Sequence, residues 1–269
     1  MLTILRCGPV TTLQDGGRFG MLKYGISASG PMDRGGYERA GALLARAGLT
    51  AIEYTQGLEL ETDEPVEVAW SEVRRLEPGE RLSLPRAAGN YGYLRFSREL
   101  EVPVLLGSRA TNVAVGLGGY KGRALKAGDR IPLGADGQST GGGGTTATEG
   151  PIRVLWGIHA DLFDRDLRRR FVEAPFEVSP SLDRMGVRLA DPAQVFAHQR
   201  HLSLVSDAIV AGDIQVLGDG APIVLMRDHQ PTGGYPRIAT IVTADLDRFA
   251  QMRPGTEVRF RPVTLEHAR

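Results

Sequence analysis

The sequence predicts a mainly β protein made of two successive domains with a few short helices. Short apolar runs rich in Val, Ile, Leu, Tyr and Phe recur along the chain, each bounded by Gly, Pro, Asp or Asn, which is the pattern of short strands joined by turns. Glycine accounts for 35 of the 269 residues, about twice its ordinary share. Many short strands with few helices favour barrels or sandwiches over a parallel α/β sheet.

A glycine-rich stretch sets the expected domain boundaries. The segment GADGQSTGGGGTTATEG at 134–150 contains no residue larger than Glu or Gln, so it cannot bury enough apolar surface to offset the entropy lost on ordering it. We therefore expect a first β domain at 1–133, a linker at 134–150 and a second β domain at 151–269. The two halves also share short motifs in the same order, among them Asp33-Arg34 and Asp183-Arg184. This order suggests two copies of one β unit, and a duplicated fold often places its site between the copies.

The individual elements follow from local patterns. The runs expected to form strands are Val66–Trp70, Arg81–Leu84, Tyr91–Phe96 and Pro103–Leu106 in the first half, and Ile152–Trp156, Gly186–Leu189, Ile214–Leu217, Ile223–Met226, Ile238–Thr243 and Glu257–Phe260 in the second. Apolar residues at helical spacing predict helices over Gly36–Ala47, Asp161–Glu173 and Asp245–Met252, the last with Thr243 as its N-cap.

Composition excludes several classes of protein. The 32 basic residues balance the 32 acidic ones, so bulk charge gives no reason to expect a nucleic-acid or membrane partner. The single cysteine, Cys7, excludes an internal disulfide framework and favours a reducing compartment. The first residues lack the apolar core of a secretory signal, and no apolar run approaches the ~18–20 residues that cross a bilayer. We expect a cytoplasmic protein.

Most familiar motifs are absent. The sequence has no G-x-x-x-x-G-K-[ST] and therefore no P-loop. The glycines at 116–122 miss the spacing of a dinucleotide-binding loop. His198 and His201 form the one close histidine pair, on a polar stretch without carboxylates, which predicts a surface position and no metal site.

Five polar, glycine-rich segments remain as candidates for a site. Paired glycines let backbone N–H groups approach a ligand, and neighbouring Arg or Lys supplies charge for a carboxylate or phosphate. Each Asp-Arg pair could instead close a turn, and each Gly-Gly pair could be a simple β-turn. Together the five segments favour an anion-binding cleft. Its candidate residues are Gln14, Asp15, Arg18, Ser29, Asp33, Arg109, Gly118, Gly119, Lys126, Asp183, Arg184, Arg188, Asp228, Gln230, Thr232, Gly233, Gly234 and Tyr235.

The same segments resemble the allophanate hydrolase subunit 2 family, also called biotin-dependent carboxyltransferase-like. The motifs that carry the resemblance are Q-D-x-G-R at Gln14–Arg18, S-x-S-G-x-M-D at Ser27–Asp33, L-G-S-R at Leu106–Arg109, G-x-G-G-x-x-G-R-A-L-K-A-G-D at Gly116–Asp129, S-x-x-D-R-M-G-V-R-L at Ser179–Leu189, I-Q-V-x-G-D-G-x-P-I-V-L at Ile214–Leu225 and T-G-G-Y-P-x-I-A-T at Thr232–Thr240. They span essentially the whole chain in order. The resemblance implies two cyclophilin-like β-barrel domains in tandem.

Within that family the sequence is most similar to the C-type (KipA-type) proteins of 5-oxoprolinase. The resemblance implies a component that acts with a B-type (KipI-like) partner and an A-type (LamB/YcsF-like) partner to open 5-oxoproline to glutamate at the expense of ATP. The implied cofactor is ATP with Mg²⁺, held by this chain or by its partner, and no covalent biotin. Ring opening through a phosphorylated amide needs cations, N–H donors and an acid/base group.

Roles for the candidate residues follow from that chemistry. Asp33, Asp183 and Arg184 are the expected catalytic residues: the two carboxylates could act as acid/base groups or orient the arginines, and Arg184 could also bind an anionic group. Arg109, Lys126 and Arg188 would bind anionic groups, and the Gly118-Gly119 and Gly233-Gly234 backbones would donate N–H groups. Gln230, Thr232 and Tyr235 would contact the substrate.

Two alternatives stay open at this point. One is a carboxyltransferase component that acts on urea or a related amide with carboxybiotin, and the other is a non-enzymatic regulator that binds a kinase inhibitor. The sequence also departs from the family at Gly157-Ile158-His159, where G-P-Q is usual, and at Pro231, which removes an N–H from the expected binding turn. These departures concern the substrate and leave the expected fold unchanged.

Overall fold

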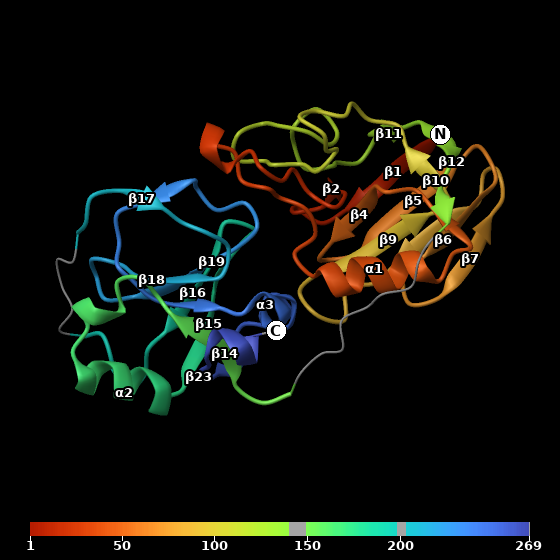
Figure 1. The fold of residues 1–269 in the computed structure, drawn as a ribbon. Helices are drawn as coiled ribbons and strands as arrows, with labels where there is room; N and C mark the ends of the chain where they lie inside the picture. The colour runs from red at the N-terminus through yellow and green to blue at the C-terminus, as the bar shows by residue number, and fades with distance from the viewer. Residues whose placement is uncertain (140–148, 198–202, 269) are drawn as a thin grey trace. The chain divides into compact units, whose positions relative to one another are not determined.

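The computed structural model describes residues 1–139, 149–197 and 203–268 and confirms the mainly β prediction (Figure 1). The chain divides into two compact units. The first comprises Met1–Gly20 with Ala28–Thr146, and the second comprises Met21–Ser27 with Ala147–Arg269. None of the described helices has the length and apolar character that crossing a membrane requires.

The first unit contains two antiparallel sheets around an aliphatic core. One has the order β11 (Arg130–Ile131), β1 (Leu2–Cys7), β5 (Leu58–Thr62), β8 (Arg81–Leu84), and the other β2 (Thr12–Gln14), β4 (Ala51–Tyr54), β9 (Gly92–Phe96), β6 (Val66–Ala69), β7 (Val73–Leu76). Two short pairs add β10 (Arg98–Leu100) with β12 (Leu133–Asp136), and β3 (Arg46–Ala47) with β13 (Gln138–Ser139). Alternate residues of β5 and β8, such as Leu58, Leu60 and Leu82, are buried, as the two-residue period of a strand requires.

Helix α1 (Arg34–Ala42) packs against β9 in this unit. Asp33 begins the helix as its N-cap and accepts a hydrogen bond from the Gly36 N–H at 2.7 Å. The preceding loop is fixed by a buried carboxylate, because Glu53 accepts from the Met32 N–H at 2.9 Å and from the Tyr93 hydroxyl at 2.8 Å. Burial, together with the nearby Glu53 carboxylate, raises the pKa of Tyr93 well above its usual value. Asp33 therefore has a structural position at the start of α1.

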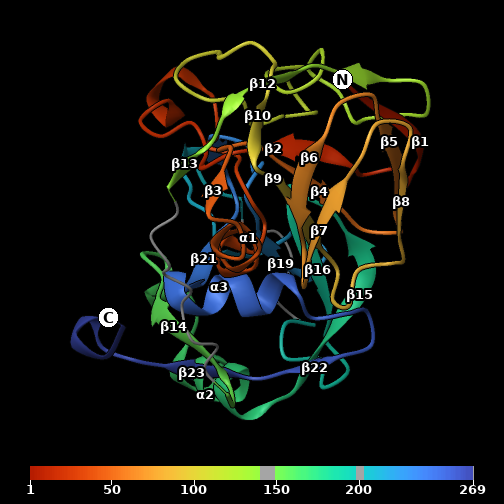
Figure 2. The same cartoon turned by 90° about the vertical axis from the view of Figure 1, so that its right-hand side faces the viewer.

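The second unit contains an eight-stranded sheet that curls into a nearly closed barrel. Its order is β22 (Glu257–Val258), β15 (Phe176–Leu182), β16 (Gly186–Ala190), β19 (Pro222–Leu225), β18 (Asp213–Val216), β21 (Arg237–Ile241), β14 (Ile152–Trp156), β23 (Phe260–Pro262). The two edge strands, β22 and β23, follow one another along a single segment (Figure 2). That segment therefore joins the two edges of the sheet and makes it a nearly closed barrel. β17 (Asp207–Ala208) and β20 (Thr232–Gly233) form a separate pair, and η1 (Leu22–Tyr24), η2 (Ala160–Leu162) and η3 (Leu265–Ala268) are short 3₁₀ turns.

An aromatic cluster fills this second unit beneath helix α2 (Arg165–Glu173). Asp164 caps the helix by accepting from the Leu167 N–H at 2.8 Å. Phe171 stacks on Phe260 with ring centroids 5.1 Å apart and also contacts Phe176 at 5.7 Å. One face of α2 is thus anchored in the core, and its opposite face carries arginines.

Helix α3 (Thr243–Ala250) is tied to β14 by a buried ion pair. Asp245 accepts from the Arg153 backbone N–H at 2.8 Å and from the Arg153 guanidinium at 2.7 Å. Thr243 is the first residue of the helix, which begins after Val242 without a side-chain cap. The prediction of Thr243 as the N-cap was wrong by one residue.

Most predicted strands form, with two departures. Pro103–Leu106 is not a strand, because Leu106 has a positive φ of 53° and the carbonyl of Leu105 accepts from the buried Arg18 instead of from a neighbouring strand. Strands β12 and β13 extend into the predicted linker as far as Ser139, and residues 140–148 lie outside the described residues. Several short strands, including β1, β4 and β5, were not predicted, because their charged or polar residues interrupt the apolar runs.

Candidate functional site

A pocket of about 400 Å³ lies on the outer face of the second unit's sheet. Alternate residues of three strands line it: Gly186 and Arg188 from β16, Ile223 and Leu225 from β19, and Gln215 and Leu217 from the β18 segment. The residues between them point inward and are buried, and Gln215 and Leu225 on the pocket side are themselves almost fully covered. The two-residue period of the strands thus separates the core from the pocket floor.

The register places a guanidinium and a carboxamide in one row across the sheet. Arg188 is paired with Ile223, and Ile223 is paired with Gln215, so the three side chains share one face. Adjacent strands are ~4.8 Å apart, so the Cα atoms of Arg188 and Gln215 are separated by about 10 Å, and Ile223 lies on the strand between them. Gly186 has no side chain to fill the adjoining space, and a Cβ there would meet Ile223 at 2.9 Å.

A loop from Met226 to Pro236 supplies two more polar groups to the pocket, Gln230 and Tyr235. Tyr235 is partly exposed, and its carbonyl accepts from Gln215 Nε2 at 3.5 Å. Gly233 lies against the same carboxamide, since a Cβ there would be 2.6 Å from Gln215 Nε2. The glycine therefore leaves room for the side chain of Gln215.

A buried ion pair fixes this loop to the β15–β16 turn. Arg184 Nε and Nη2 donate to the two carboxylate oxygens of Asp228 at 2.8 and 3.0 Å, and both side chains are about 5% exposed. The Asp228 N–H also donates to the Arg184 carbonyl at 2.7 Å. Arg184 and Asp228, predicted as site residues, thus meet as a pair that positions the pocket walls.

Asp183 lies at the rim of the pocket. Its Oδ1 accepts from the N–H groups of Met185 and Gly186 at 2.7 and 3.0 Å, which closes the turn between β15 and β16. Asp183 is exposed, so its second oxygen is accessible to solvent or to a ligand. This carboxylate is the acidic group that the structure places at the pocket.

His229 lies between the paired Asp228 and the pocket residue Gln230. It is buried, and its Nδ1 lies 2.6 Å from the Gln230 carbonyl, a distance that assigns the proton to Nδ1. Burial lowers the pKa of His229 below its usual value. The sequence pattern did not predict a role for this histidine. A buried neutral ring hydrogen-bonded to the loop stabilises the loop's conformation at neutral pH.

The predicted residues of the first unit form a separate, interior network. Gln14 donates to the Thr111 carbonyl at 3.0 Å, and its Oε1 accepts from the Gly30 N–H at 3.1 Å. The Asp15 carboxylate accepts from the Ser108 hydroxyl and the Arg109 N–H, both at 2.6 Å. These groups are almost fully buried and hold the loop at 102–119 in place.

Arg18 completes that network. Its guanidinium is buried and donates to the carbonyls of Leu105 at 3.1 Å and Ala110 at 2.9 Å. Gly118 allows this close packing, because a Cβ there would lie 2.1 Å from the Ala110 carbonyl oxygen. The predicted anion-binding arginine is thus engaged with backbone carbonyls.

The other candidates of the first unit are engaged or exposed. The Arg109 side chain donates to the Val102 carbonyl at 3.1 Å, and the Gly119 N–H donates to the Arg109 carbonyl at 2.7 Å. Lys126 is exposed at a tight turn. Ser29 is buried with a φ of 55°, and its hydroxyl has no hydrogen-bond partner among the described residues.

Thr232 and Gly234 lie beside the pocket without lining it. Thr232 is exposed in β20, and the Gly234 carbonyl accepts from the Leu204 N–H at 2.7 Å. Asp183, Arg188, Gln230 and Tyr235 are therefore the predicted residues that the structure brings together in one pocket. Gln215 was missed, because in sequence it is a single polar residue inside an apolar strand.

The pocket offers one guanidinium, two carboxamides, one phenol and one carboxylate around an apolar floor. Within the described residues, no group of three or more His, Cys, Asp and Glu side chains is placed to hold a metal ion. His198 and His201 lie outside the described residues. The pocket suits a small, polar, anionic ligand with a compact apolar body.

Comparison with known proteins agrees with this architecture. The family described as carboxyltransferase domain, subdomain A and B, matches residues 24–262. The chain is 37% identical to the C subunit of 5-oxoprolinase from Escherichia coli K12 over 100% of this chain and 93% of that protein, and 32% identical to the Haemophilus influenzae protein of the same name, again over 100% and 93%. The crystal structure of Kluyveromyces lactis urea carboxylase superposes with a TM-score of 0.86 at 25% identity, covering 99% of this chain and 28% of that one.

The match therefore extends through both β units, and it includes a stand-alone chain of similar length as well as one part of a much larger enzyme. The strands and the polar motifs extend through the same two units that these similarities cover. The chain belongs to the carboxyltransferase domain family, subdomains A and B.

Proposed function

We propose that the chain is the C-type component of an ATP-dependent 5-oxoprolinase and that the pocket containing Arg188 and Gln215 binds the lactam substrate. The row Arg188–Ile223–Gln215 carries this proposal. A lactam is a cis amide, so its N–H and C=O lie on the same side of the ring. The carboxamide of Gln215 has both an acceptor and a donor and can pair with both groups.

The remaining groups of the substrate match the rest of the pocket. The ring carboxylate would bind the Arg188 guanidinium, whose ion pair within the described part of the chain is a long contact, 3.7 Å, with the exposed Asp219. The ring would rest on Ile223, and Gln230 and Tyr235 would close over it. Asp183 at the rim is the group proposed to exchange a proton with the opening ring.

ATP belongs to the proposed reaction, and the pocket does not fit it. The pocket has one cationic side chain, Arg188, and its Asp183 carboxylate faces the same space, whereas a triphosphate needs several cations or N–H donors around its oxygens. We therefore assign no step at this pocket to ATP. The B-type (KipI-like) and A-type (LamB/YcsF-like) partners are part of the proposal, because the chain is similar to proteins named as one subunit of 5-oxoprolinase.

The test is 5-oxoproline-stimulated ATP hydrolysis by this chain mixed with its own B-type and A-type homologues. Arg188→Gln should raise KM for 5-oxoproline about tenfold, because one charge-assisted contact is lost. Gln215→Leu should abolish stimulation while the chain stays folded. The matched control is Arg261→Gln, which removes one exposed charge from β23. No stimulation by 5-oxoproline in a stable complex of the three proteins would contradict the proposal.

Carboxyl transfer to urea is the second candidate, favoured by the superposition on urea carboxylase. Urea is also an amide and can pair with Gln215, but it carries no carboxylate for Arg188. One variant therefore distinguishes the two reactions. Arg188→Gln should impair the reaction of 5-oxoproline and leave a urea-dependent reaction unchanged.

A further inference from the structure

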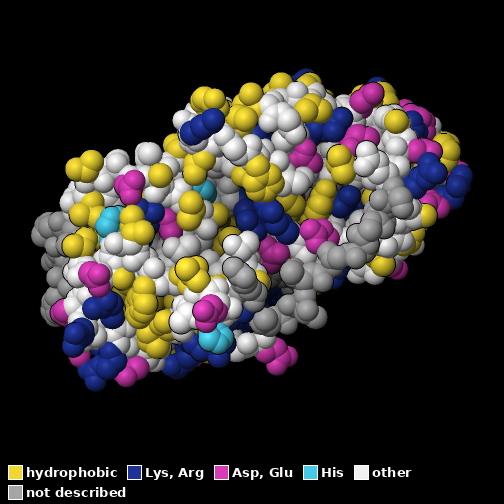
Figure 3. All heavy atoms as spheres, in the orientation of Figure 1, with side chains coloured by type: hydrophobic (Ala, Val, Ile, Leu, Met, Phe, Trp, Pro, Cys, Tyr) yellow, Lys and Arg dark blue, Asp and Glu magenta, His cyan; other side chains and the backbone are white. Residues whose placement is uncertain are grey.

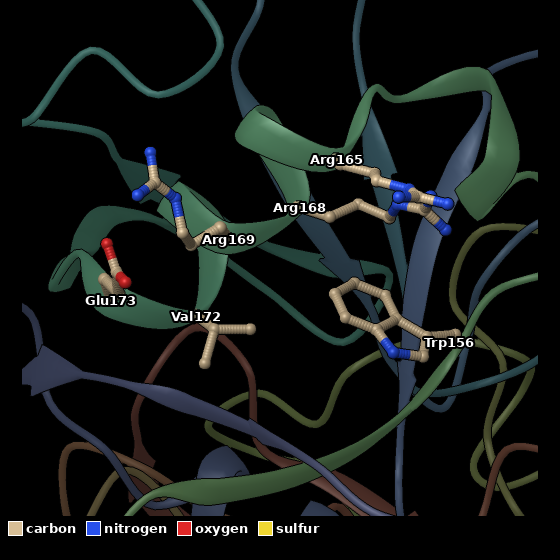
Figure 4. A pocket seen from close by; sticks show the side chains of 6 residues that line it. All are labelled: Trp156, Arg165, Arg168, Arg169, Val172 and Glu173. Atoms are coloured by element: carbon tan, nitrogen blue, oxygen red, sulfur yellow. The ribbon is translucent and has the colours of Figure 1, made fainter.

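A second pocket, of about 370 Å³, lies over helix α2. Figure 4 shows its lining: Trp156 at the end of β14, and Arg165, Arg168, Arg169, Val172 and Glu173 from α2. It shares no residue with the pocket of Gln215. Neither its aromatic ring nor its arginines have a role in the proposed lactam reaction.

Trp156 gives the pocket a rigid aromatic surface. The indole packs on the fully buried ring of Phe171, with centroids 6.2 Å apart and a tilt of 49°, which fixes its orientation. The side chain is nevertheless 41% exposed. A large aromatic ring held by the core and open on its outer side is suited to stacking with another flat ring.

Two guanidinium groups lie together beside this ring. Basic side chains gather over α2, at the lower left of the space-filling view (Figure 3). Arg165 and Arg168 are three residues apart on the helix and therefore project from the same face. In Figure 4 the Arg165 and Arg168 side chains extend to the same side of the pocket as Trp156, whereas those of Arg169 and Glu173 extend to the opposite side. Like charges at this spacing repel one another, and a shared anion would remove the repulsion.

The two arginines are also available to a ligand. Arg165 is exposed and makes no hydrogen bond or ion pair with any residue in the described part of the chain. Arg168 donates to Asp161 at 2.8 Å, but Asp161 is 95% exposed, and such exposed pairs contribute little. Arg169, by contrast, is paired with Asp166 on the helix itself.

We infer that this pocket binds a nucleotide-type ligand, with its flat base on Trp156 and a phosphate between Arg165 and Arg168. Aromatic side chains bind bases by stacking, and paired guanidinium groups match the oxygens of a phosphate. The aromatic surface and the cationic pair lie side by side, as the base and phosphate of one nucleotide do. The inference goes beyond the lactam pocket and stands whether or not that pocket binds 5-oxoproline.

The chain's two tryptophans allow a direct test. Trp70 lies in the first unit, so the Trp70→Phe variant reports on Trp156 alone. Its fluorescence, excited at the red edge of the indole band where adenine does not absorb, would be followed during titration with ATP, AMP or inorganic pyrophosphate. Arg165→Gln combined with Arg168→Gln is the test variant, and Arg253→Gln combined with Arg261→Gln, at two exposed positions that do not line this pocket, removes the same charge elsewhere on the unit.

We expect saturable quenching of Trp156 fluorescence by ATP and AMP. The test variant should weaken the affinity for both nucleotides about tenfold or more, and the control variant should leave it unchanged. Absence of saturable quenching by either nucleotide would overturn the inference. Equal binding of pyrophosphate and ATP would overturn it too, since the base would then contribute nothing. If Trp70→Phe fails to fold, equilibrium dialysis of ATP and pyrophosphate against the unsubstituted chain measures the same two affinities.

Discussion

The two units use similar polar residues for opposite purposes. In the first unit, Arg18 is buried and its guanidinium is engaged with backbone carbonyls. In the second unit, Arg188 is partly exposed on the sheet face and lines a pocket. Both belong to glycine-rich motifs that predict anion binding. Exposure, which the motif does not encode, separates an arginine that holds a loop from one that can hold a ligand.

The Asp-Arg pairs of the two halves differ in the same way. Asp33 caps α1, and Asp183 closes the β15–β16 turn. The shared letters therefore do not mark equivalent places in the structure. The cores differ as well, since the first unit is packed with aliphatic residues and the second contains the cluster around Phe171 and Phe260.

The largest effect is expected from breaking the buried pair of the second unit. Asp228→Ala leaves the Arg184 guanidinium buried without its carboxylate, which should cost about 3–5 kcal/mol of unfolding free energy. Urea unfolding would measure the loss. Replacing both partners by apolar residues, Arg184→Met with Asp228→Leu, should recover most of it. A double variant as unstable as Asp228→Ala alone would contradict this account of the pair.

The contrast between Arg18 and Arg188 can be tested by making the same substitution at both positions and comparing the changes in unfolding free energy. Arg18→Met should lower the unfolding free energy by about 3 kcal/mol, because the carbonyls of Leu105 and Ala110 lose a buried donor. Arg188→Met should change stability by less than about 0.5 kcal/mol, as surface substitutions do. Parallel unfolding curves would show both values. Equal destabilisation by the two variants would remove the distinction between the units.

The smallest effect concerns pH. The pKa of His229 is lower in the folded chain than in the unfolded chain because the ring is buried. As pH falls below about 6.5, the unfolded chain takes up the proton first, so this histidine's contribution to stability is complete above that pH and is lost as the pH falls toward the folded-state pKa. His159 shifts in the same direction, so His229→Gln should flatten only part of the decline in unfolding free energy between neutral and mildly acidic pH. An unchanged pH profile would contradict the assignment.

The sequence was sufficient for the fold class and for four of the residues that line the pocket. Ile152–Trp156 and Arg81–Leu84 were predicted with the bounds that the structure gives them, because their turns and apolar runs are clear. Asp183, Arg188, Gln230 and Tyr235 were among the predicted residues. Gln215 was not, because its role depends on the register that aligns it with Ile223 and Arg188 across three strands.

Burial was the other property that local patterns could not supply. Gln14, Asp15 and Arg18 have the composition of a ligand site, but they satisfy the backbone of a loop at 102–119 that is distant in sequence. The same long-range contact explains why Pro103–Leu106 is not a strand. A polar motif indicates that hydrogen bonds will be made, and the tertiary structure decides with which partner.

The closure of the second barrel also affects how this unit folds. β14 pairs with β23 in parallel, with Ile152 opposite Phe260, so the first and last strands of the unit must meet before the barrel can approach closure. Contacts between residues so distant in sequence slow folding. During synthesis, the sheet's two edges stay open until the segment with β22 and β23 has emerged, and throughout that interval its unpaired backbone can recruit other strands.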